Sequence, residues 1–202
     1  MQDIASFNEI FDQVIEYYHL HDQVDQDFIN PHEAGNLAHL LYRKCWIDTV
    51  QWHLEDIIRD PAIDPERALE IKRRIDASNQ DRTDLVEKID DFYVEKFKNV
   101  AFEKGAKINT ESPAWAIDRL SILALKIYHM KEQLVRKDVG EDHLKSAQNK
   151  LQVLWVQRQD LTQAISELIS DILAGRRLMK VYRQMKMYND PSLNPVLYGE
   201  RK

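Results

Sequence analysis

Apolar residues recur at spacings of three and four along most of the chain, as in helices that bury one face. No stretch alternates between apolar and polar residues for long enough to predict a sheet. The pattern therefore predicts an all-α fold, an up-and-down bundle of about five helices. The clearest stripes are Phe7, Ile10, Phe11, Val14, Ile15 and Tyr18; Leu40, Ile47, Val50, Leu54 and Ile57; Ile117, Leu120, Ala124, Ile127 and Leu134; and Leu144, Leu151, Leu154, Leu161, Ile165, Leu168 and Ile172.

Capping residues and breakers set the expected helix boundaries. A capping box over residues 6–9 predicts a first helix at about 7–21. Proline after a capping residue predicts three further starts, giving helices at about 31–60, from 65 into the 97–104 region, and 113–137. A fifth is expected at about 141–187, with a weak point at Gly175 and a plausible C-terminal cap for the third helix at Gly105.

This order predicts two long antiparallel helical hairpins and an N-terminal helix. We expect residues 1–188 to form one helical-bundle domain and residues 189–202, which contain proline and asparagine, to form a tail.

Composition adds limits on compartment and partners. The chain has 202 residues, of which 44% are hydrophobic and 31% charged, and this is typical of a soluble folded protein. The net charge of -6 does not favour nucleic-acid binding. Cys45 is the single cysteine, and the chain shows neither a signal-peptide pattern nor an apolar run of membrane-spanning length. A cytoplasmic location is therefore expected.

Two arginines interrupt the apolar stripes. Arg82 and Arg158 each occupy a position where a buried side chain is expected, and an interior charge needs a partner. In an antiparallel hairpin, residues equally far from the turn lie side by side. Counted from the turn of each hairpin, Asp48 and Arg82 are offset along the helix axis by roughly 7 Å, and Asp118 and Arg158 by roughly 5 Å. The hypothesis is one Asp–Arg pair inside each hairpin, in two hairpins that arose by duplication.

Two roles for these residues stay open. The pairs can fix helix register without any chemistry. Alternatively, the arginines can face a polar pocket and bind an anionic group. The candidate residues for such a pocket or for the buried ion pairs are Asp48, His53, Glu55, Asp56, Arg59, Asn79, Arg82, Asp84, Asp118 and Arg158.

Metal and catalytic motifs are incomplete. The Glu-x-x-Asp pattern of Glu87 and Asp90 fits half of the magnesium site of all-α nucleotide pyrophosphatases, and Glu55 and Asp56 do not complete it. These four acids are weak candidates for Mg²⁺ or Mn²⁺. A ferritin-like di-iron site lacks its second Glu-x-x-His copy. Phosphate loops, His-Glu-x-x-His and Gly-x-Ser-x-Gly are absent from the sequence.

Cations gather near the C-terminus, with no acid between Asp171 and Asp190. Such residues are either solvated near a helix end or form a docking surface for an anionic partner. They are Arg176, Arg177, Lys180, Arg183 and Lys186.

Several sequence blocks resemble the DUF4254 family, a bacterial family of unknown function that is common in Bacteroidetes. They are residues 51–61, 75–76 together with 79–85, 117–129 and 186–191, of which the Asp-Arg-Leu-Ser-Ile-Leu segment at 118–123 is the most specific. The resemblance implies a bacterial, helical, single-domain protein and carries no catalytic residues to transfer. It also implies an association with glycosyltransferases of envelope polysaccharide synthesis.

Two functions remain from this reasoning. The first is a non-enzymatic cytoplasmic binding or accessory protein, with a protein partner or as a homodimer, that serves glycan assembly. The alternative is a metal-assisted enzyme that acts on a phosphorylated or nucleotide-linked substrate in a polar pocket between the helices. A pocket shared by both arginines and the acids of residues 55–56 would favour the enzyme, whereas arginines neutralised in a closed core would favour the binding protein.

Overall fold

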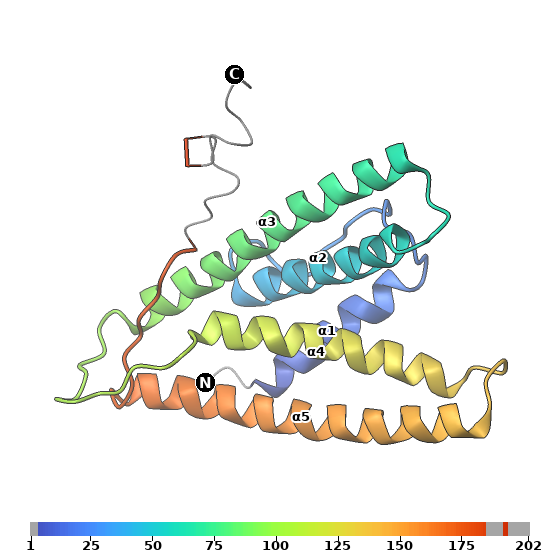
Figure 1. Cartoon of the computed structure of the whole chain (residues 1–202). Helices are drawn as coiled ribbons and strands as arrows, with labels where there is room; N and C mark the ends of the chain where they lie inside the picture. The colour runs from blue at the N-terminus through green and yellow to red at the C-terminus, as the bar shows by residue number, and fades with distance from the viewer. Residues whose placement is uncertain (1–3, 185–191, 194–202) are drawn as a thin grey trace.

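The computed structural model describes residues 4–184 and 192–193, and in these residues it is all-helical with five helices and no strand. Helices α2 to α5 run back and forth between the two ends of the molecule, and α1 crosses them obliquely (Figure 1). The predicted fold class is confirmed. Their bounds are α1 Ala5–Tyr18, α2 Leu37–Ile58, α3 Pro65–Phe97, α4 Pro113–Leu134 and α5 Glu141–Leu173.

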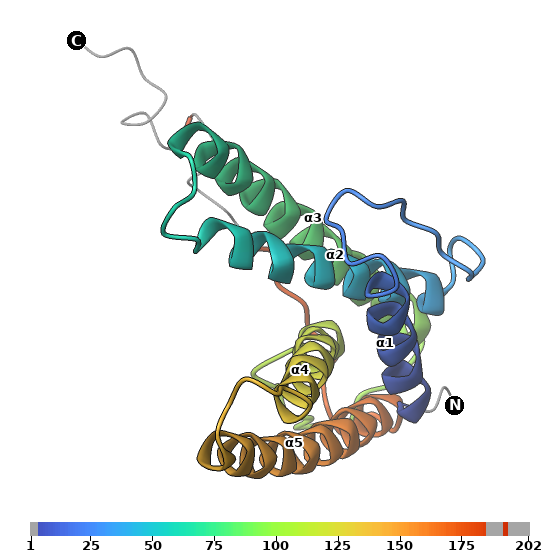
Figure 2. The ribbon, with the colours of Figure 1, turned by 90° about the vertical axis from the view of Figure 1, so that its right-hand side faces the viewer.

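The predicted hairpins are present, and α1 joins them. Helices α2 and α3 pack along each other, as do α4 and α5, and α1 contacts both α2 and α4. Figure 2 shows α1 on one side of the two hairpins, which spread apart on the other side. The most buried residues of α1 are Phe7, Phe11, Val14, Ile15 and Tyr18.

Caps explain where the helices begin. Asp64 and Ser112 accept hydrogen bonds from the first turns of α3 and α4, and a proline follows each of them, as predicted. The start expected at residue 31 is wrong, because the Asn30 side chain instead accepts from the His32 backbone in a turn. Asn36 caps α2 by accepting from the His39 N–H at 2.7 Å. The first helix starts at Ala5 without a side-chain cap, so Ser6 is not its capping residue.

The last helix is shorter than predicted. It ends at Leu173 instead of continuing to about residue 187. Gly175 has a φ of 77°, and a Cβ there would lie 2.5 Å from the backbone oxygen of Ala101. Glycine is therefore required at this stop. Beyond it the chain runs extended beside the loop between α3 and α4, where the Lys107 N–H donates to Arg176 and the Leu178 N–H donates to Lys107.

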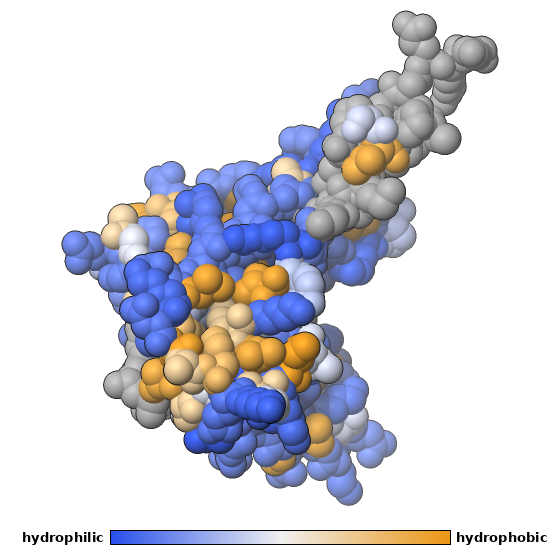
Figure 3. All heavy atoms as spheres, turned by 90° about the vertical axis from the view of Figure 1, so that its left-hand side faces the viewer, coloured by the Kyte–Doolittle hydropathy of each residue, from blue (hydrophilic) through white to orange (hydrophobic). Residues whose placement is uncertain are grey.

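Hydrophobic side chains gather at this end of the molecule. Figure 3 shows them as a patch among hydrophilic neighbours, over the region where the α3–α4 loop meets the segment after α5. No helix within the described residues is both long and apolar enough to cross a membrane. The predicted tail over 189–202 lies outside the described residues, apart from Ser192 and Leu193.

Candidate functional site

A groove of about 490 Å³ opens between α2, α3 and α4. Helix α2 supplies most of its wall, α3 contributes one arginine, and α4 contributes two apolar residues. The groove lies among the residues that the sequence marked as polar candidates. Its lining consists of Asp48, Gln51, Trp52, Glu55, Asp56, Arg59, Arg82, Ile122 and Leu125.

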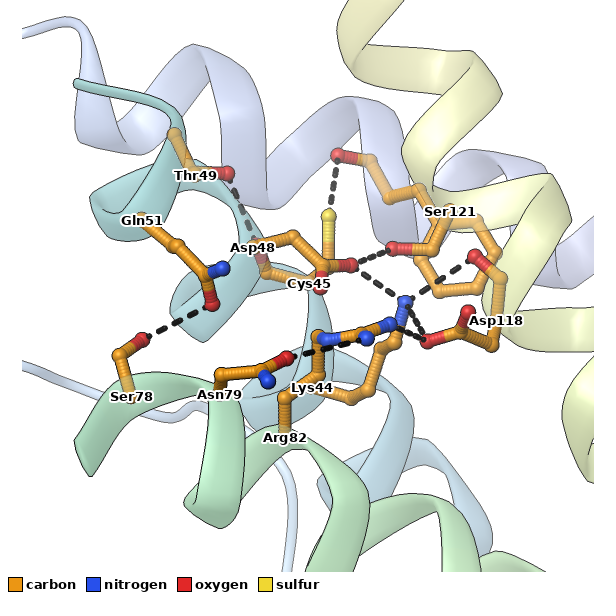
Figure 4. A network of polar contacts seen from close by, with 11 residues as sticks. Lys44, Cys45, Asp48, Thr49, Gln51, Ser78, Asn79, Arg82, Asp118 and Ser121 are labelled. Carbon is orange, nitrogen blue, oxygen red and sulfur yellow. Dashed lines mark hydrogen bonds and ion pairs between the residues drawn. The ribbon is translucent and has the colours of Figure 1, made fainter. Parts of the chain in front are cut away.

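The floor of the groove is a buried network of charges centred on Lys44. Its other members are Asp48, Arg82, Asp118 and Ser121. The Nζ of Lys44 lies 2.5 Å from Oδ2 of Asp48 and 2.8 Å from Oδ1 of Asp118, and it donates to the Asp118 backbone oxygen at 3.0 Å. Ser121 donates to the same Asp48 oxygen at 2.6 Å. Arg82 donates to Oδ1 of Asp118 at 2.8 Å. Figure 4 shows Lys44 between the two carboxylates.

Helical spacing places each member of this network. Lys44 and Asp48 are four residues apart and therefore lie on one face of α2. Asp118 and Ser121 are three apart on α4. On α3, the Asn79 amide oxygen accepts from Arg82 at 3.2 Å and so orients its guanidinium. Three helices thus contribute to one polar layer in an otherwise apolar interior.

Burial controls the electrostatics of this layer. Lys44 is fully buried, and Asp48 and Asp118 are 6% and 5% exposed. Burial raises the pKa of the Asp48 carboxyl, which the charge on Lys44 opposes and the Asp118 carboxylate reinforces. With Arg82 included, two cations face two carboxylates. The layer therefore balances its own charge, as a buried network must.

One atom of the network is left without a partner. Oδ2 of Asp48 accepts from both Lys44 and Ser121, whereas its Oδ1 has no hydrogen-bond partner among the described residues and is buried. A buried acceptor without a donor costs about 1–3 kcal/mol. Asp48 belongs to the groove lining, but this oxygen is itself buried, so a ligand donor reaches it only when the neighbouring side chains move aside.

The predicted pairing inside each hairpin is wrong. Arg82 of the first hairpin pairs with Asp118 of the second, and Asp48 pairs with Lys44 of its own helix. Arg158 is 5% exposed, as its place on the stripe predicted, but its partners belong to α1. It donates to the backbone and side-chain oxygens of Asn8 at 3.1 and 2.9 Å and to Asp12 at 2.8 Å. The prediction from axial offsets treated each hairpin as isolated. In the structure, α1 and the neighbouring hairpin supply the closer partners.

The acids that were weak metal candidates do not come together. Glu55 and Asp56 line the groove, and Glu55 pairs with Arg59 at 3.0 Å. Glu87 accepts from Arg183, and Asp90 accepts from Ser112 at 2.9 Å. Neither of these two acids lines the groove. The two halves of the predicted Mg²⁺ or Mn²⁺ motif therefore lie apart, one in the groove and the other outside it.

Asp90 is a second buried carboxyl with perturbed chemistry. Burial raises its pKa from the ordinary 3.8 to about 6, against the opposing effect of the Ser112 hydrogen bond. Its Oδ1 has no hydrogen-bond partner among the described residues. Asp84, another sequence candidate, is exposed, accepts from Gln80 at 2.7 Å and lies outside the groove.

His53 lies beside the groove rather than in its lining. Burial lowers its pKa, and the nearby His19 and His129 rings add to this effect, while Asp22 opposes it. The ring is therefore neutral at pH 7. Its neighbour Trp52 reaches the groove wall.

The basic residues near the C-terminus are largely neutralised within the chain. Arg176 and Arg177 both donate to Asp171. Arg183 pairs with Glu87 at 3.3 Å and also with Asp91. Lys180 lies over the Tyr182 ring, and Lys186 falls outside the described residues. An anionic partner for this segment stays a prediction, and it would compete with these internal contacts.

Sequence reasoning missed Lys44, Gln51, Trp52 and Ser121. Lys44 carried a usable signal, since it lies four residues before Asp48 within an apolar run. The stripe chosen for α2 had the wrong register, because Ile47 is half-buried and the deeper positions are Leu41, Cys45 and Asp48. Cys45 is not a nucleophile here, because burial raises the pKa of its thiol to about 12.

Comparison with known proteins connects the groove to a family. The sequence model of a family described as a protein of unknown function (DUF4254) matches residues 38–181. This span runs from the second residue of α2 to beyond the end of α5 and includes every residue of the groove. No curated protein matches the chain, and no solved structure matches it either. Since the match covers most of the sequence, the chain belongs to the DUF4254 family.

Proposed function

We propose that this protein is a binding protein whose groove holds a neutral, hydroxyl-rich group such as a sugar unit. The observation that carries the proposal is the buried Oδ1 of Asp48, which has no hydrogen-bond partner among the described residues and belongs to a residue of the groove lining. A ligand hydroxyl can donate to this oxygen and satisfy it. The other Asp48 oxygen is held by Lys44 and Ser121, so the carboxylate is already oriented before a ligand arrives.

The charge of the lining supports a neutral ligand over a phosphate. Three carboxylates, those of Asp48, Glu55 and Asp56, face two guanidinium groups, those of Arg59 and Arg82. Both arginines already pair with carboxylates of the chain. An added phosphate would therefore meet a groove with excess negative charge, which lowers its affinity.

The remaining lining suits a sugar ring. Trp52, Ile122 and Leu125 offer apolar surface against which C–H groups can pack, and Gln51 can donate and accept at the rim. The Gln51 oxygen already accepts from Ser78 at 3.3 Å, which leaves its amide N–H groups for a ligand. Apolar walls with a few oriented polar groups are typical of small-molecule sites.

The alternative function, a metal-assisted enzyme for a phosphorylated or nucleotide-linked substrate, has one supporting observation. The raised pKa of Asp48 places a carboxyl suited to proton transfer at the groove floor. This function needs a cation at Glu55 and Asp56 to offset the negative charge of the lining. The same binding measurement separates the two functions.

The test is calorimetric titration with neutral monosaccharides, sugar phosphates and nucleotide sugars, each with and without Mg²⁺ or Mn²⁺. The proposal predicts binding of a neutral sugar without metal, and a loss of affinity of at least tenfold in Gln51→Leu. Asp84→Asn is the matched control, because this exposed acid lies outside the groove. Binding that requires both metal and phosphate would establish the alternative, and no binding of neutral sugars at millimolar concentration would reject the proposal.

The setting of this function is also a proposal. A role in glycan assembly and a bacterial cytoplasmic location follow from the family resemblance and from the lone buried thiol of Cys45, which is typical of a reducing compartment. A protein partner or a second copy of the chain would then present the bound sugar to an enzyme. Size-exclusion chromatography with light scattering measures whether the chain forms the expected homodimer.

A further inference from the structure

Three histidines from three helices converge next to the groove. His19 follows the end of α1, His53 lies on α2 and His129 lies on α4. One ring nitrogen from each lies within 4.8 Å of the other two. The imidazole centroids are 5.1–5.4 Å apart, and each pair of rings is inclined at 64–71°. The rings are therefore steeply inclined to one another, with one nitrogen of each near a common point.

Hydrogen bonds orient two of the rings toward that point. His19 Nδ1 lies 2.6 Å from the Ile15 carbonyl oxygen, and His129 Nδ1 lies 2.7 Å from a Glu132 carboxylate oxygen. Both of these oxygens are acceptors, so each Nδ1 carries the proton and each Nε2 carries a lone pair. Metal-binding histidines show this arrangement, in which the outer nitrogen donates to a carbonyl or carboxylate.

The inner nitrogens have few other partners. His129 Nε2 is buried and has no hydrogen-bond partner among the described residues. His19 Nε2 lies 3.2 Å from His53 Nε2. Without metal, a proton on His53 Nε2 can bridge these two nitrogens, and a metal ion can take the place of that proton. A tetrahedral ion with bonds of about 2.0–2.1 Å separates its nitrogen ligands by about 3.3 Å, close to this spacing.

Aromatic rings hold the imidazoles in place. Tyr18 stacks on His53 with centroids 4.9 Å apart, Tyr128 on His19 at 4.1 Å, and Trp52 on His129 at 4.8 Å. Each ring is therefore packed on one face before any ligand arrives. Such fixed geometry is a requirement for a metal site, because ligands that must first be ordered bind more weakly.

We infer that His19, His53 and His129 form a site for a divalent transition-metal ion of the Zn²⁺ class. Three neutral imidazoles suit Zn²⁺ and leave a fourth position for water or another oxygen ligand. Asp22 offers such an oxygen, since its carboxylate lies 3.7 Å from His53 Nε2. Asp22 has a φ of 54°, a left-handed conformation that turns the chain directly after α1.

The test is a titration of untagged, chelator-treated protein with Zn²⁺ against a chromophoric competitor. We expect one ion per chain, and His19→Ala, His53→Ala and His129→Ala should each lower the affinity at least tenfold. His143→Ala, an exposed histidine on α5, is the matched control and should leave the affinity unchanged. Equal affinity in the control and the three cluster variants would overturn the inference.

Two further measurements do not depend on whether the histidine variants fold. Glu132→Gln keeps all three imidazoles and weakens only the acceptor of His129, so it should lower the Zn²⁺ affinity by about 10–100-fold. Co²⁺ should bind with the intense visible absorption of a four-coordinate ion. A weak, six-coordinate spectrum together with an unchanged affinity in Glu132→Gln would exclude the site.

Discussion

The groove floor and the histidine cluster are both polar centres built by several helices, but they differ in how their groups are satisfied. In the floor, the cations of Lys44 and Arg82 are matched by carboxylates at 2.5–2.8 Å. In the cluster, His129 Nε2 has no partner among the described residues, and His53 and His19 face each other through their inner nitrogens. The charges of the floor are paired with one another, and only Oδ1 of Asp48 has no partner among the described residues, whereas the cluster is oriented but incomplete.

This difference separates charged groups whose pairing stabilises the fold from imidazoles that await a metal ion. Removing one member of a closed ionic network leaves its partner buried and uncompensated, and the fold bears the cost. Removing one member of the cluster takes away a ligand atom and leaves no buried charge behind. Stability measurements should therefore report on the floor, and metal binding should report on the cluster.

The largest effect is expected for Lys44→Met. The substitution leaves Asp48 and Asp118 buried near each other without the cation that contacts both. We expect a loss of about 3–5 kcal/mol in the free energy of unfolding, measured by urea denaturation. Lys126→Met, at an exposed position of α4, is the control and should change stability by about 0.5 kcal/mol at most. A loss below about 1 kcal/mol in Lys44→Met would mean that the floor is not a closed network.

The network around Lys44 shows which features the sequence could predict and which it could not. Local signals located α3 and α4, because the capping side chains of Asp64 and Ser112 and the following prolines act within one turn. Partners between elements were not predictable in this way. Arg82 was assigned to its own hairpin and pairs with the other, since spacing within a hairpin carries no information on how two hairpins pack.

The histidine cluster escaped sequence reasoning for the same reason. His19 and His129 are more than a hundred residues apart, and no motif spacing connects them with His53. What the sequence did identify was the set of acids and arginines on α2 and α3, because polar residues near an apolar stripe are conspicuous. The groove contains five of them, namely Asp48, Glu55, Asp56, Arg59 and Arg82.

Asp90 differs from the carboxylates of the floor, because it is a buried carboxyl whose partner is a hydroxyl instead of a cation. Its pKa of about 6 in the folded chain exceeds the ordinary 3.8, so the folded state holds its proton more tightly than the unfolded state. The associated stability is present below pH 4 and is lost as the pH rises through about 6, by up to about 3 kcal/mol.

Asp90→Asn removes this titration and keeps an oxygen that can accept from Ser112. We expect the variant to be more stable than the parent at pH 7.5 and to approach it at pH 4.5, by urea denaturation at both values. Comparing the two proteins at each pH cancels the histidine titrations that they share. An equal stability difference at both values would contradict the raised pKa of Asp90.

A smaller loss is expected for Arg158→Met. This arginine is as buried as the groove floor, yet its acidic partner Asp12 has a side chain that is 47% exposed and can be rehydrated. The cost is then mainly the loss of hydrogen bonds to Asn8, about 1–3 kcal/mol. Arg73→Met, at an exposed position of α3, is the control. A loss as large as that of Lys44→Met would show that α1 and α5 share a network as closed as the floor.

The smallest effect should come from Trp52, the residue common to both centres. Its ring lines the groove and stacks on His129 at an interplanar angle of 10°. Zn²⁺ at the cluster should therefore change the tryptophan fluorescence, and Trp52→Phe should abolish that change while keeping the ion bound. Trp155→Phe, on α5, should retain it.

Trp52→Phe should also weaken a sugar in the groove by about 0.5–1.5 kcal/mol, because a smaller ring offers less stacking surface. If Zn²⁺ alters sugar affinity through Trp52, the sugar must alter Zn²⁺ affinity by the same factor. A factor of one in both titrations would exclude the coupling and make the groove and the histidine cluster independent sites on a shared wall.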